Sequence, residues 1–213
     1  AKGIFANGEF FYSSYLEILN KDLKWNAYGN QIISILPDGR FIMIVDQRDT
    51  LKRYPDRPRV VELSGGTTFD LGETGSLEFP GGAVEPGEKI KVGCLRELKE
   101  EGGLEEQEAI MYRRIHPIYA FGSDIAAAHF FSVVYLSGMK YENYTPTDGG
   151  LTVLALSETE VERNIRNGVI ASGQAVMLGW GFYKEVREAR KTPELLKELT
   201  DEGYISVEKV RIE

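Results

Sequence analysis

The stretch from Phe79 to Leu104 constrains the fold more strongly than any other part of the chain. Its sequence is FPGGAVEPGEKIKVGCLRELKEEGGL, and the apolar residues between positions 90 and 101 recur at spacings of three and four, which predicts a short helix with one face on a sheet. Gly102 and Gly103 end this helix. Before it, Gly87 permits a positive φ and Gly81-Gly82 permits a close backbone approach, so we expect a tight glycine-containing loop that leads into the helix.

Three glutamates, Glu97, Glu100 and Glu101, crowd the end of the predicted helix. Residues three and four apart share a helix face, so these carboxylates are neighbours that repel one another. On the triplet alone, a solvated acidic helix face is the commoner explanation. The rigid loop before the helix favours a site for a hard divalent cation, which carboxylates, water and phosphate oxygens coordinate well. Glu88 and Arg96 are spaced to pair across the junction of loop and helix and to hold the cluster in place.

Short apolar runs bounded by turn residues predict strands on both sides of this helix. Two of them flank Pro37-Asp38-Gly39 and predict a β-hairpin. The other expected strands lie within residues 9–19, near residue 60, before Pro80, within 109–136 and over 151–156.

Further helices are predicted in the last third of the chain. Ser157 and Glu160 form a capping box for a helix that ends near Gly168. Residues from about 172 to 190 continue the helical pattern, and Thr192-Pro193 starts a last helix that Gly203 ends. Strands with helices inserted between them predict an α/β protein whose mixed sheet carries helices on its faces.

The composition is that of one globular domain, with 213 residues, 42% hydrophobic and 27% charged. A net charge of −8 disfavours nonspecific binding of nucleic acid. We expect no membrane span, because no apolar run approaches the roughly 20 residues that a span needs. The N-terminus lacks the apolar core of a signal peptide, and the single cysteine, Cys94, suits a reducing compartment. The expected location is therefore cytoplasmic.

The Phe79–Leu104 segment resembles the Nudix box, G-x5-E-x7-R-E-U-x-E-E-x-G-U, where U is a bulky aliphatic residue. Every fixed position of that pattern is present in this chain. The matching residues are Gly82, Glu88, Arg96, Glu97, Leu98, Glu100, Glu101, Gly103 and Leu104. The resemblance covers a small part of the chain, but so many positions at fixed spacing make it specific.

The resemblance implies a Nudix-like α/β/α sandwich with a mixed β-sheet, and hydrolysis of a nucleoside diphosphate derivative with Mg²⁺ or Mn²⁺ as cofactor. Glu88 and Arg96 would be mainly structural. Such a metal neutralises the pyrophosphate and activates a water, from which a carboxylate removes a proton. By position, the implied metal ligands are Glu97, Glu100, Glu101 and the Gly81 carbonyl.

The resemblance leaves the catalytic base open, because family members use either a glutamate of the box helix or one in a distant loop. The first option points to Glu97 or Glu100 in this chain. The second points to the polar loop at residues 137–150, which offers Glu142 and Asp148. Neither loop residue has a supporting motif, and the alternative for each is a solvated carboxylate.

Features outside the box resemble the ADP-ribose and nucleotide-sugar pyrophosphatase branch. The segment IMIVDQRDT ends a strand with Gln-Arg before a loop, SLEFPGG leads into the box as in that branch, and Pro117 follows the box where the branch carries a proline. Ile125 departs from the branch, which has an acidic residue there. Arg48 is a candidate substrate-binding residue through its planar fork, or else an ordinary surface arginine. Gly82 is a second candidate, through its backbone.

We expect structural and not catalytic roles for the two histidines and the cysteine. His116 and His129 are expected to be structural residues and not metal ligands. Cys94 lies on the apolar helix face, which predicts a buried, inert thiol. The aromatic residues that could stack on a base, although most aromatics belong to the core, are Trp25, Tyr28, Tyr119 and Phe121.

Two other functions remain as alternatives. The first is removal of a 5′-terminal pyrophosphate or cap from RNA, for which KRYPDRPR at residues 52–59 is a local basic patch. The second is a non-catalytic Nudix-like nucleotide-binding module, although such modules often lose box glutamates and this box is whole. Residues 29–213 would form the Nudix hydrolase domain. Residues 1–28 would form an N-terminal strand segment, either dimerising as in the resembled branch or an edge strand of the same sheet.

Overall fold

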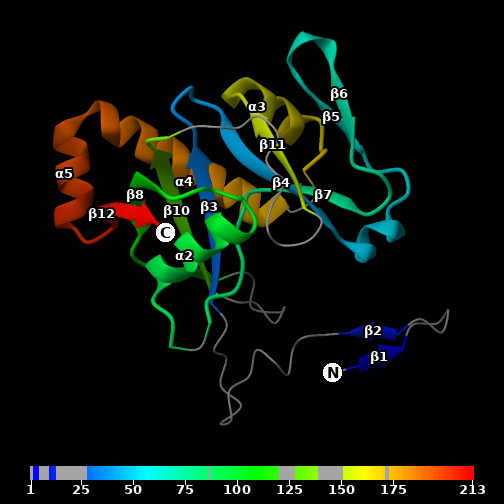
Figure 1. Cartoon of the computed structure of the whole chain (residues 1–213), viewed down its shortest axis with the longest axis horizontal. Helices are drawn as coiled ribbons and strands as arrows, with labels where there is room; N and C mark the ends of the chain where they lie inside the picture. Colours follow the sequence, from blue (N-terminus) through cyan, green and yellow to red (C-terminus); the bar gives the residue numbers. More distant parts are fainter. Residues whose placement is uncertain are drawn as a thin grey trace.

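The structure, a computed structural model, describes residues 2–4, 10–12, 28–85, 87–119, 128–138, 151–170 and 173–213. Its central sheet has the strand order β11-β4-β3-β10-β8-β12, with β7 also paired to β4 and β9 to β10 (Figure 1). The β3–β10 pair is parallel and the other pairs are antiparallel, so the sheet is mixed as predicted. The strands are β3 (Tyr28–Ile35), β4 (Phe41–Gln47), β7 (Gly75–Glu78), β8 (Gln107–Arg114), β9 (Ile118–Tyr119), β10 (Ala128–Leu136), β11 (Thr152–Leu156) and β12 (Ile205–Ile212).

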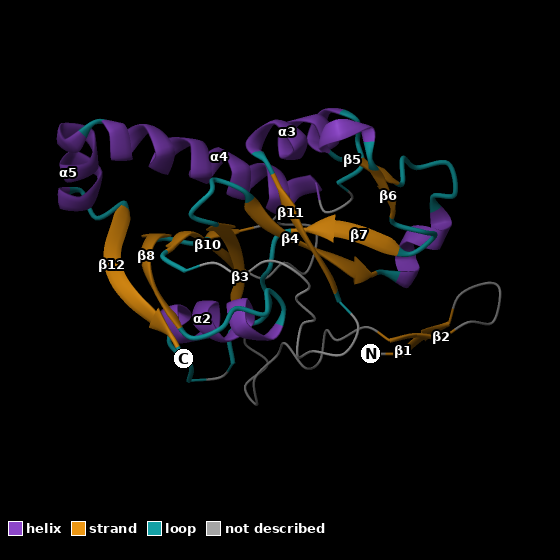
Figure 2. Ribbon diagram, turned by 45° about the horizontal axis from the view of Figure 1, so that its top comes forward, coloured by secondary structure: helices purple, strands orange, loops and turns teal. Residues whose placement is uncertain are grey.

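Helices cover both faces of this sheet (Figure 2). One face carries α2 (Ile90–Glu100), the helix expected from the acidic segment. The other carries α3 (Glu158–Arg166) and α4 (Gly173–Lys191), and α5 (Pro193–Asp201) packs at the end of α4 beside β12. The architecture is therefore the expected α/β/α sandwich. Among the helices of the described ranges, none combines the length and apolarity needed to cross a membrane.

Each face of the sheet has its own apolar core. Under α2, Cys94 and Leu98 pack on fully buried side chains of β3 and β4, including Ile32 and Ile42. Under α4 the core is aromatic, and Phe41 contacts both Trp180 and Tyr183 edge-on, with ring centroids 5.1 and 4.9 Å apart. Complete burial of one such side chain stabilises the fold by about 1.5–3 kcal/mol. The two cores hold the sheet rigid between the helix layers.

The segment that leads into α2 fills the opening where β3 and β4 diverge. These two strands pair only at Ile35 and Phe41. Strand β7 takes up the remaining edge of β4. The chain then crosses to β3, where the Asn30 amide donates to the Gly82 carbonyl at 2.8 Å and the Val84 amide donates to the Tyr28 carbonyl at 2.8 Å. Backbone hydrogen bonds therefore fix the loop before α2 on the sheet.

Most of the expected elements are confirmed. The β3–β4 hairpin turns at residues 37–39, with Gly39 at φ +86°. Ser157 and Glu160 form the complete capping box of α3. The short strand expected near residue 60 is β5 (Val60–Glu62), which pairs with β6 (Thr68–Asp70) in a separate hairpin. Two short 3-10 helices lie at Asp49–Arg53, after β4, and at Ser64–Gly66, between β5 and β6.

Two parts of the strand prediction differ from the structure. Strand β12 is absent from the prediction, which ended the pattern at Gly203, yet it pairs along the full length of β8. Near the N-terminus, the expected strand is present as β2 (Phe10–Tyr12). It pairs with β1 (Lys2–Ile4) in a separate two-stranded sheet and so is not an edge strand of the central sheet. The rest of the proposed strand, residues 13–19, lies outside the described residues.

Candidate functional site

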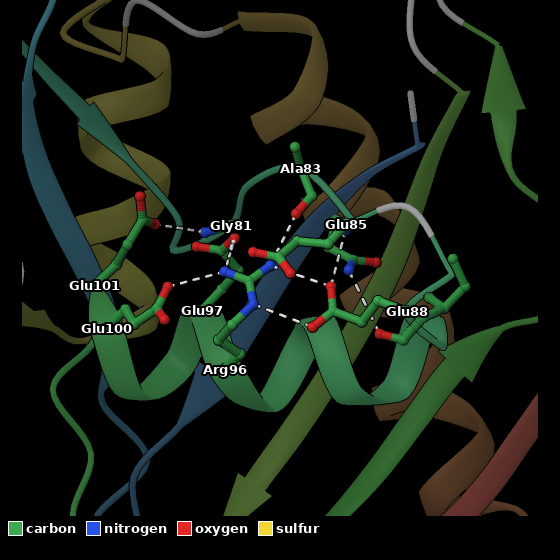
Figure 3. A network of polar contacts seen from close by, with 10 residues as sticks. Gly81, Ala83, Glu85, Glu88, Arg96, Glu97, Glu100 and Glu101 are labelled. Atoms are coloured by element: carbon green, nitrogen blue, oxygen red, sulfur yellow. Dashed lines mark hydrogen bonds and ion pairs between the residues drawn. The ribbon is translucent and has the colours of Figure 1, made fainter. Parts of the chain in front are cut away.

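Arg96 lies at the centre of a network of ion pairs that joins the loop to α2 (Figure 3). On the helix, its Nη1 donates to Glu97 Oε1 and to Glu100 Oε2, each at 2.8 Å. On the loop, its Nε and Nη2 donate to the two oxygens of Glu88 at 3.1 and 3.2 Å, and Nη2 also donates to the Ala83 carbonyl at 3.0 Å. The Glu88–Arg96 pair expected from the sequence is thus formed. These hydrogen bonds, above all those that Arg96 donates to Glu88, raise the pKa of Arg96.

Glu88 is fixed from several sides. Besides Arg96, the amide of Glu85 donates to its Oε2 at 2.9 Å. The hydrogen bond from Arg96 lowers the pKa of Glu88, which therefore stays ionised at neutral pH. Its carboxylate lies over Gly93, where an added Cβ would be only 2.8 Å from Oε2. Gly87 turns the loop at φ +85°, the positive φ that its position predicted.

Glu97 is buried beneath the glycine loop. Only 7% of the residue is exposed, so this part of α2 is not the solvated acidic face of the alternative explanation. A Cβ added to Gly82 would lie 2.4 Å from Glu97 Oε1, and any side chain at position 82 would displace this carboxylate. Burial raises the pKa of Glu97, the charges of Glu100 and Glu88 act in the same direction, and Arg96 opposes them.

Glu101 is not part of the Arg96 network, and its side chain lies at the start of the loop. Its Oε2 accepts a hydrogen bond from the Gly81 amide at 2.8 Å (Figure 3). Burial raises the pKa of Glu101 to about 7, the negative charges of Glu97 and Asp46 add to this rise, and the hydrogen bond and Arg48 oppose it. In the absence of a cation, Glu101 therefore titrates near neutral pH.

Arg48 belongs to a neighbouring group at the ends of β4 and β7. Its Nε and Nη2 donate to the two oxygens of Glu78 at 3.2 and 3.1 Å. Its Nη2 also pairs with Asp46 Oδ2 at 2.9 Å. The side chain is 51% exposed, so Arg48 is neither buried nor an unpaired surface arginine.

The family model of the NUDIX domain matches residues 65–166, which include the loop, α2 and the strands on both sides. The network around Arg96 lies at the Nudix box of that domain.

Comparisons with individual proteins reach lower similarity. No curated protein matches the sequence. Among solved structures, the chain is similar to one described as ADP compounds hydrolase, with 17% identity over 86% of this chain and 83% of that chain and a TM-score of 0.45. It is also similar to MutT protein from Methanosarcina mazei Go1 (15% identity, 70% and 87% of the two chains, TM-score 0.41) and to NUDIX hydrolase from Nitrosomonas europaea (16%, 74% and 90%, 0.44). At such identities these likenesses give no substrate.

The Nudix box of this structure is held by protein contacts. Within the described ranges, no three or more side chains of histidine, cysteine, aspartate or glutamate are grouped so as to hold a metal ion. Arg96 holds Glu97 and Glu100 through one nitrogen, and the Gly81 amide holds Glu101 apart from them. One oxygen each of Glu97 and Glu101 still accepts no hydrogen bond from any described residue. These donors fit a hard cation that takes few protein ligands and completes its shell with water and phosphate.

The other residues singled out in the sequence fall into four groups. Cys94 is fully buried with Sγ 3.2 Å from Ser132 Oγ, and burial raises its pKa to about 12, which confirms an inert thiol. His116 is exposed, and His129 is partly buried against Gly29, with burial lowering the histidine's pKa. Tyr28 is 42% exposed and contacts Phe130. Outside the described residues, or with side chains outside them, lie Trp25, Tyr119, Phe121, Ile125, Glu142 and Asp148.

Two acidic residues beside the box were not predicted from the sequence. Asp46 and Glu78 hold Arg48, and Asp46 also acts on the charge of Glu101. A sequence signal existed for both. Asp46 and Arg48 are two apart at the end of a strand and so share a face, and Glu78 lies in the strand that leads directly into the box.

Proposed function

We propose that this protein is a Nudix hydrolase that cleaves the pyrophosphate bond of a nucleoside diphosphate derivative, ADP-ribose or a nucleotide sugar, with Mg²⁺ or Mn²⁺ as cofactor. The observation that carries the proposal is the pair of incompletely hydrogen-bonded carboxylates, Glu97 and Glu101, beside the glycine loop. Burial raises the pKa of both groups and neighbouring carboxylates add to the rise, and a bound cation would offset both effects.

The proposed metal ligands are Glu97, Glu100, Glu101 and the Gly81 carbonyl. A divalent cation supplies charge neutralisation of the pyrophosphate and acidification of water when it is bound. The carbonyls of residues 80 and 82 accept hydrogen bonds from β3, so the Gly81 carbonyl between them faces away from β3 in extended backbone. Glu88 and Arg96 keep the carboxylates in place, because Arg96 contacts the loop and two of the glutamates together.

In the proposed reaction, a water oxygen adds to one phosphorus atom and the bridging P–O bond of the pyrophosphate breaks. The water loses a proton to a carboxylate, and two phosphate monoesters form. We propose Glu97 or Glu100 of the box helix as the base, with Glu142 as the alternative from the distant loop. Arg48 and the backbone at Gly82 would bind the substrate. Arg48 supports this role by presenting a partly exposed guanidinium close enough to affect the charge of Glu101.

The resemblance to the ADP-ribose and nucleotide-sugar branch depends on sequence features outside the box. It also suggests how the chain assembles. We propose that residues 1–28 form a dimerising segment and residues 29–213 the hydrolase domain of a homodimer. The pairing of β1 with β2 outside the central sheet supports a separate role for that segment. The single buried thiol, Cys94, suits the reducing conditions of the cytoplasm.

The RNA alternative receives less support from the basic patch at residues 52–59. Arg57 uses its Nη2 to donate to the backbone carbonyls of Gly72, Glu73 and Gly75, the last at 2.7 Å. Its guanidinium therefore holds the turn before β7 and is not presented to a phosphate backbone.

The direct test is hydrolysis of ADP-ribose with Mg²⁺, followed by separation of AMP from ribose 5-phosphate. We expect both products in equal amounts, and no turnover when EDTA replaces the metal. A panel of nucleotide sugars, dinucleotides and nucleoside triphosphates defines the substrate class. Absence of turnover across the whole panel, with tight nucleotide binding, would instead identify a binding module. Turnover of 5′-triphosphorylated or capped RNA alone would favour the RNA alternative.

A further inference from the structure

We propose that Glu78 is a positioning residue that fixes the guanidinium of Arg48 for contact with the substrate's pyrophosphate. This inference rests on the proposed function, in which Arg48 binds the substrate. Its own content is that the acidic residue at the end of β7, outside the Nudix box, determines how well Arg48 performs that role.

The contact between the two residues is a paired one. Two nitrogens of Arg48, Nε and Nη2, donate to the two oxygens of Glu78 at 3.2 and 3.1 Å. Two parallel hydrogen bonds fix the plane of the guanidinium as well as its distance, which a single contact cannot do. Asp46 adds a third contact to Nη2 at 2.9 Å.

Glu78 is suited to this task because it is nearly buried in a paired strand. The side chain is only 12% exposed and comes from a strand paired with β4, where Glu78 lies opposite Ile44. A buried carboxylate needs a partner, and among the described residues both of its oxygens are partnered by Arg48 alone. The strand then continues into the loop, and Gly81, three residues later, holds Glu101. One short stretch of backbone therefore positions both Arg48 and a box glutamate.

Arg48 retains a donor for a ligand. Its Nη1 has no hydrogen-bond partner within the described part of the chain, and half of its side chain is exposed. Glu78 and Asp46 thus hold one edge of the guanidinium and leave the other edge open. An arginine fixed in this way loses less rotamer freedom when an anion binds. Ordering one flexible side chain at a binding site costs about 0.5–1.5 kcal/mol, so its fixation changes affinity by about two- to tenfold.

The test compares Glu78→Ala, Glu78→Gln, Arg48→Ala and the double variant Glu78→Ala/Arg48→Ala. The probe is α,β-methylene-ADP with Mg²⁺ in calorimetric titrations of the full chain, and kcat and KM are measured on ADP-ribose. We expect Glu78→Ala to weaken probe binding and raise KM by about three- to tenfold with kcat changed less than twofold. Glu78→Gln, which keeps one acceptor oxygen, should lie between Glu78→Ala and the unaltered chain. The double variant should bind no more weakly than Arg48→Ala alone, because Glu78 acts through Arg48.

Matched controls separate this role from a purely structural one. Glu158→Ala removes a carboxylate that pairs with Arg187 between α3 and α4 on the other face of the sheet, and should leave KM unchanged. Melting temperatures are measured for every variant, and binding is compared only among folded proteins. Unchanged probe binding in Glu78→Ala, or additive losses in the double variant, would overturn the positioning role. Unchanged binding in Arg48→Ala would instead remove Arg48 from the proposed function, and absence of any turnover would remove that function itself.

Discussion

Two glutamates enclosed by the fold have opposite electrostatic environments. Glu160 of α3 accepts hydrogen bonds from the Ser157 amide at 2.6 Å, the Ser157 hydroxyl at 2.7 Å and the Ser64 amide. Burial alone would raise its pKa, but these hydrogen bonds lower it. Glu101 beside the Nudix box accepts one hydrogen bond, from Gly81, and its pKa rises to about 7.

The contrast shows that burial by itself does not mark a functional carboxylate. Glu160 is the less exposed residue, yet both of its oxygens accept hydrogen bonds from protein groups. Its role is therefore to stabilise the fold. Glu101 lies in a site that leaves its charge incompletely balanced, and such imbalance is typical of groups that bind a cation or act on a substrate. We therefore expect substitutions at the two positions to separate stability from activity.

The largest effect is expected for Glu101→Gln. The variant keeps the shape of the side chain and removes the charge of a proposed metal ligand, so kcat with Mg²⁺ should fall by about a hundredfold or more. Stability without metal at pH 8 should not fall, because repulsion with Glu97 and Asp46 is lost. Steady-state kinetics and thermal unfolding in EDTA measure the two quantities. Unchanged turnover would remove Glu101 from the site.

Gly82→Ala is expected to have the next largest effect. The new Cβ would lie 2.4 Å from Glu97 Oε1 and displace that carboxylate, so turnover should fall by about tenfold or more. Gly181→Ala in α4 is the control, because nothing lies within 4 Å of a Cβ there. It should leave turnover unchanged and stabilise the helix by about 0.5–1 kcal/mol. Equal activities of the two variants would contradict the close packing of Glu97 on the loop.

Glu160→Gln should affect stability and not turnover. The two oxygens of Glu160 accept hydrogen bonds from Ser157 and Ser64. An amide has only one acceptor oxygen, so the NH₂ group of the introduced glutamine would face one of these donors. A loss of about 1–3 kcal/mol in the free energy of unfolding is expected, measured by urea titration. The folded fraction should retain its kcat. A variant with full stability but reduced kcat would reverse the roles assigned to the two glutamates.

The pH dependence of stability should have opposite signs at the two positions. Glu101 has a raised pKa in the folded state, so in EDTA its contribution is largest at low pH and is lost as pH rises from about 4.5 to about 7. Glu160 has a lowered pKa, so its contribution is present above the unfolded value and is lost as pH falls through the folded one. Between pH 5 and 8, the free energy of unfolding of the unaltered chain should therefore fall by about 1–3 kcal/mol relative to that of Glu101→Gln. Relative to Glu160→Gln, the unaltered chain should lose no stability over the same pH range. The opposite roles of the two glutamates would be contradicted if both variants showed the same pH dependence of the free energy of unfolding.

Much of the fold followed from local sequence patterns. The box helix, the β3–β4 hairpin and the capping box of α3 each depend on residues close together in the chain, and all three are confirmed. Strand β12 was missed for a physical reason. It buries Ile205 in the core under α4 but Val210 and Ile212 in the core under α2, so its apolar residues change from one face to the other and break the period of two.

Less of the candidate site could be predicted from the sequence. Spacing placed the box glutamates on one helix side, but the partners of each depend on where the loop crosses the sheet. Arg96 takes Glu97 and Glu100, and Gly81 takes Glu101, because β3 fixes the loop above α2. The link between Glu78 and Arg48 joins residues 30 positions apart, and no local pattern predicts it. The assignment of Glu142 as a base remains a prediction.

The crossing of the chain from β4 to β3 also sets how this protein can tolerate changes in length. Residues 78 to 84 make a ladder contact with one strand and then the next, and each successive residue faces the opposite side. One residue inserted or deleted there would turn Gly82 away from Glu97 and exchange the donors and acceptors offered to β3. Among the described strands, β5 and β6 pair with each other and with no strand of the central sheet, so a change of length between them would leave that sheet in register, while the stretch from Glu78 to Val84 must keep its length.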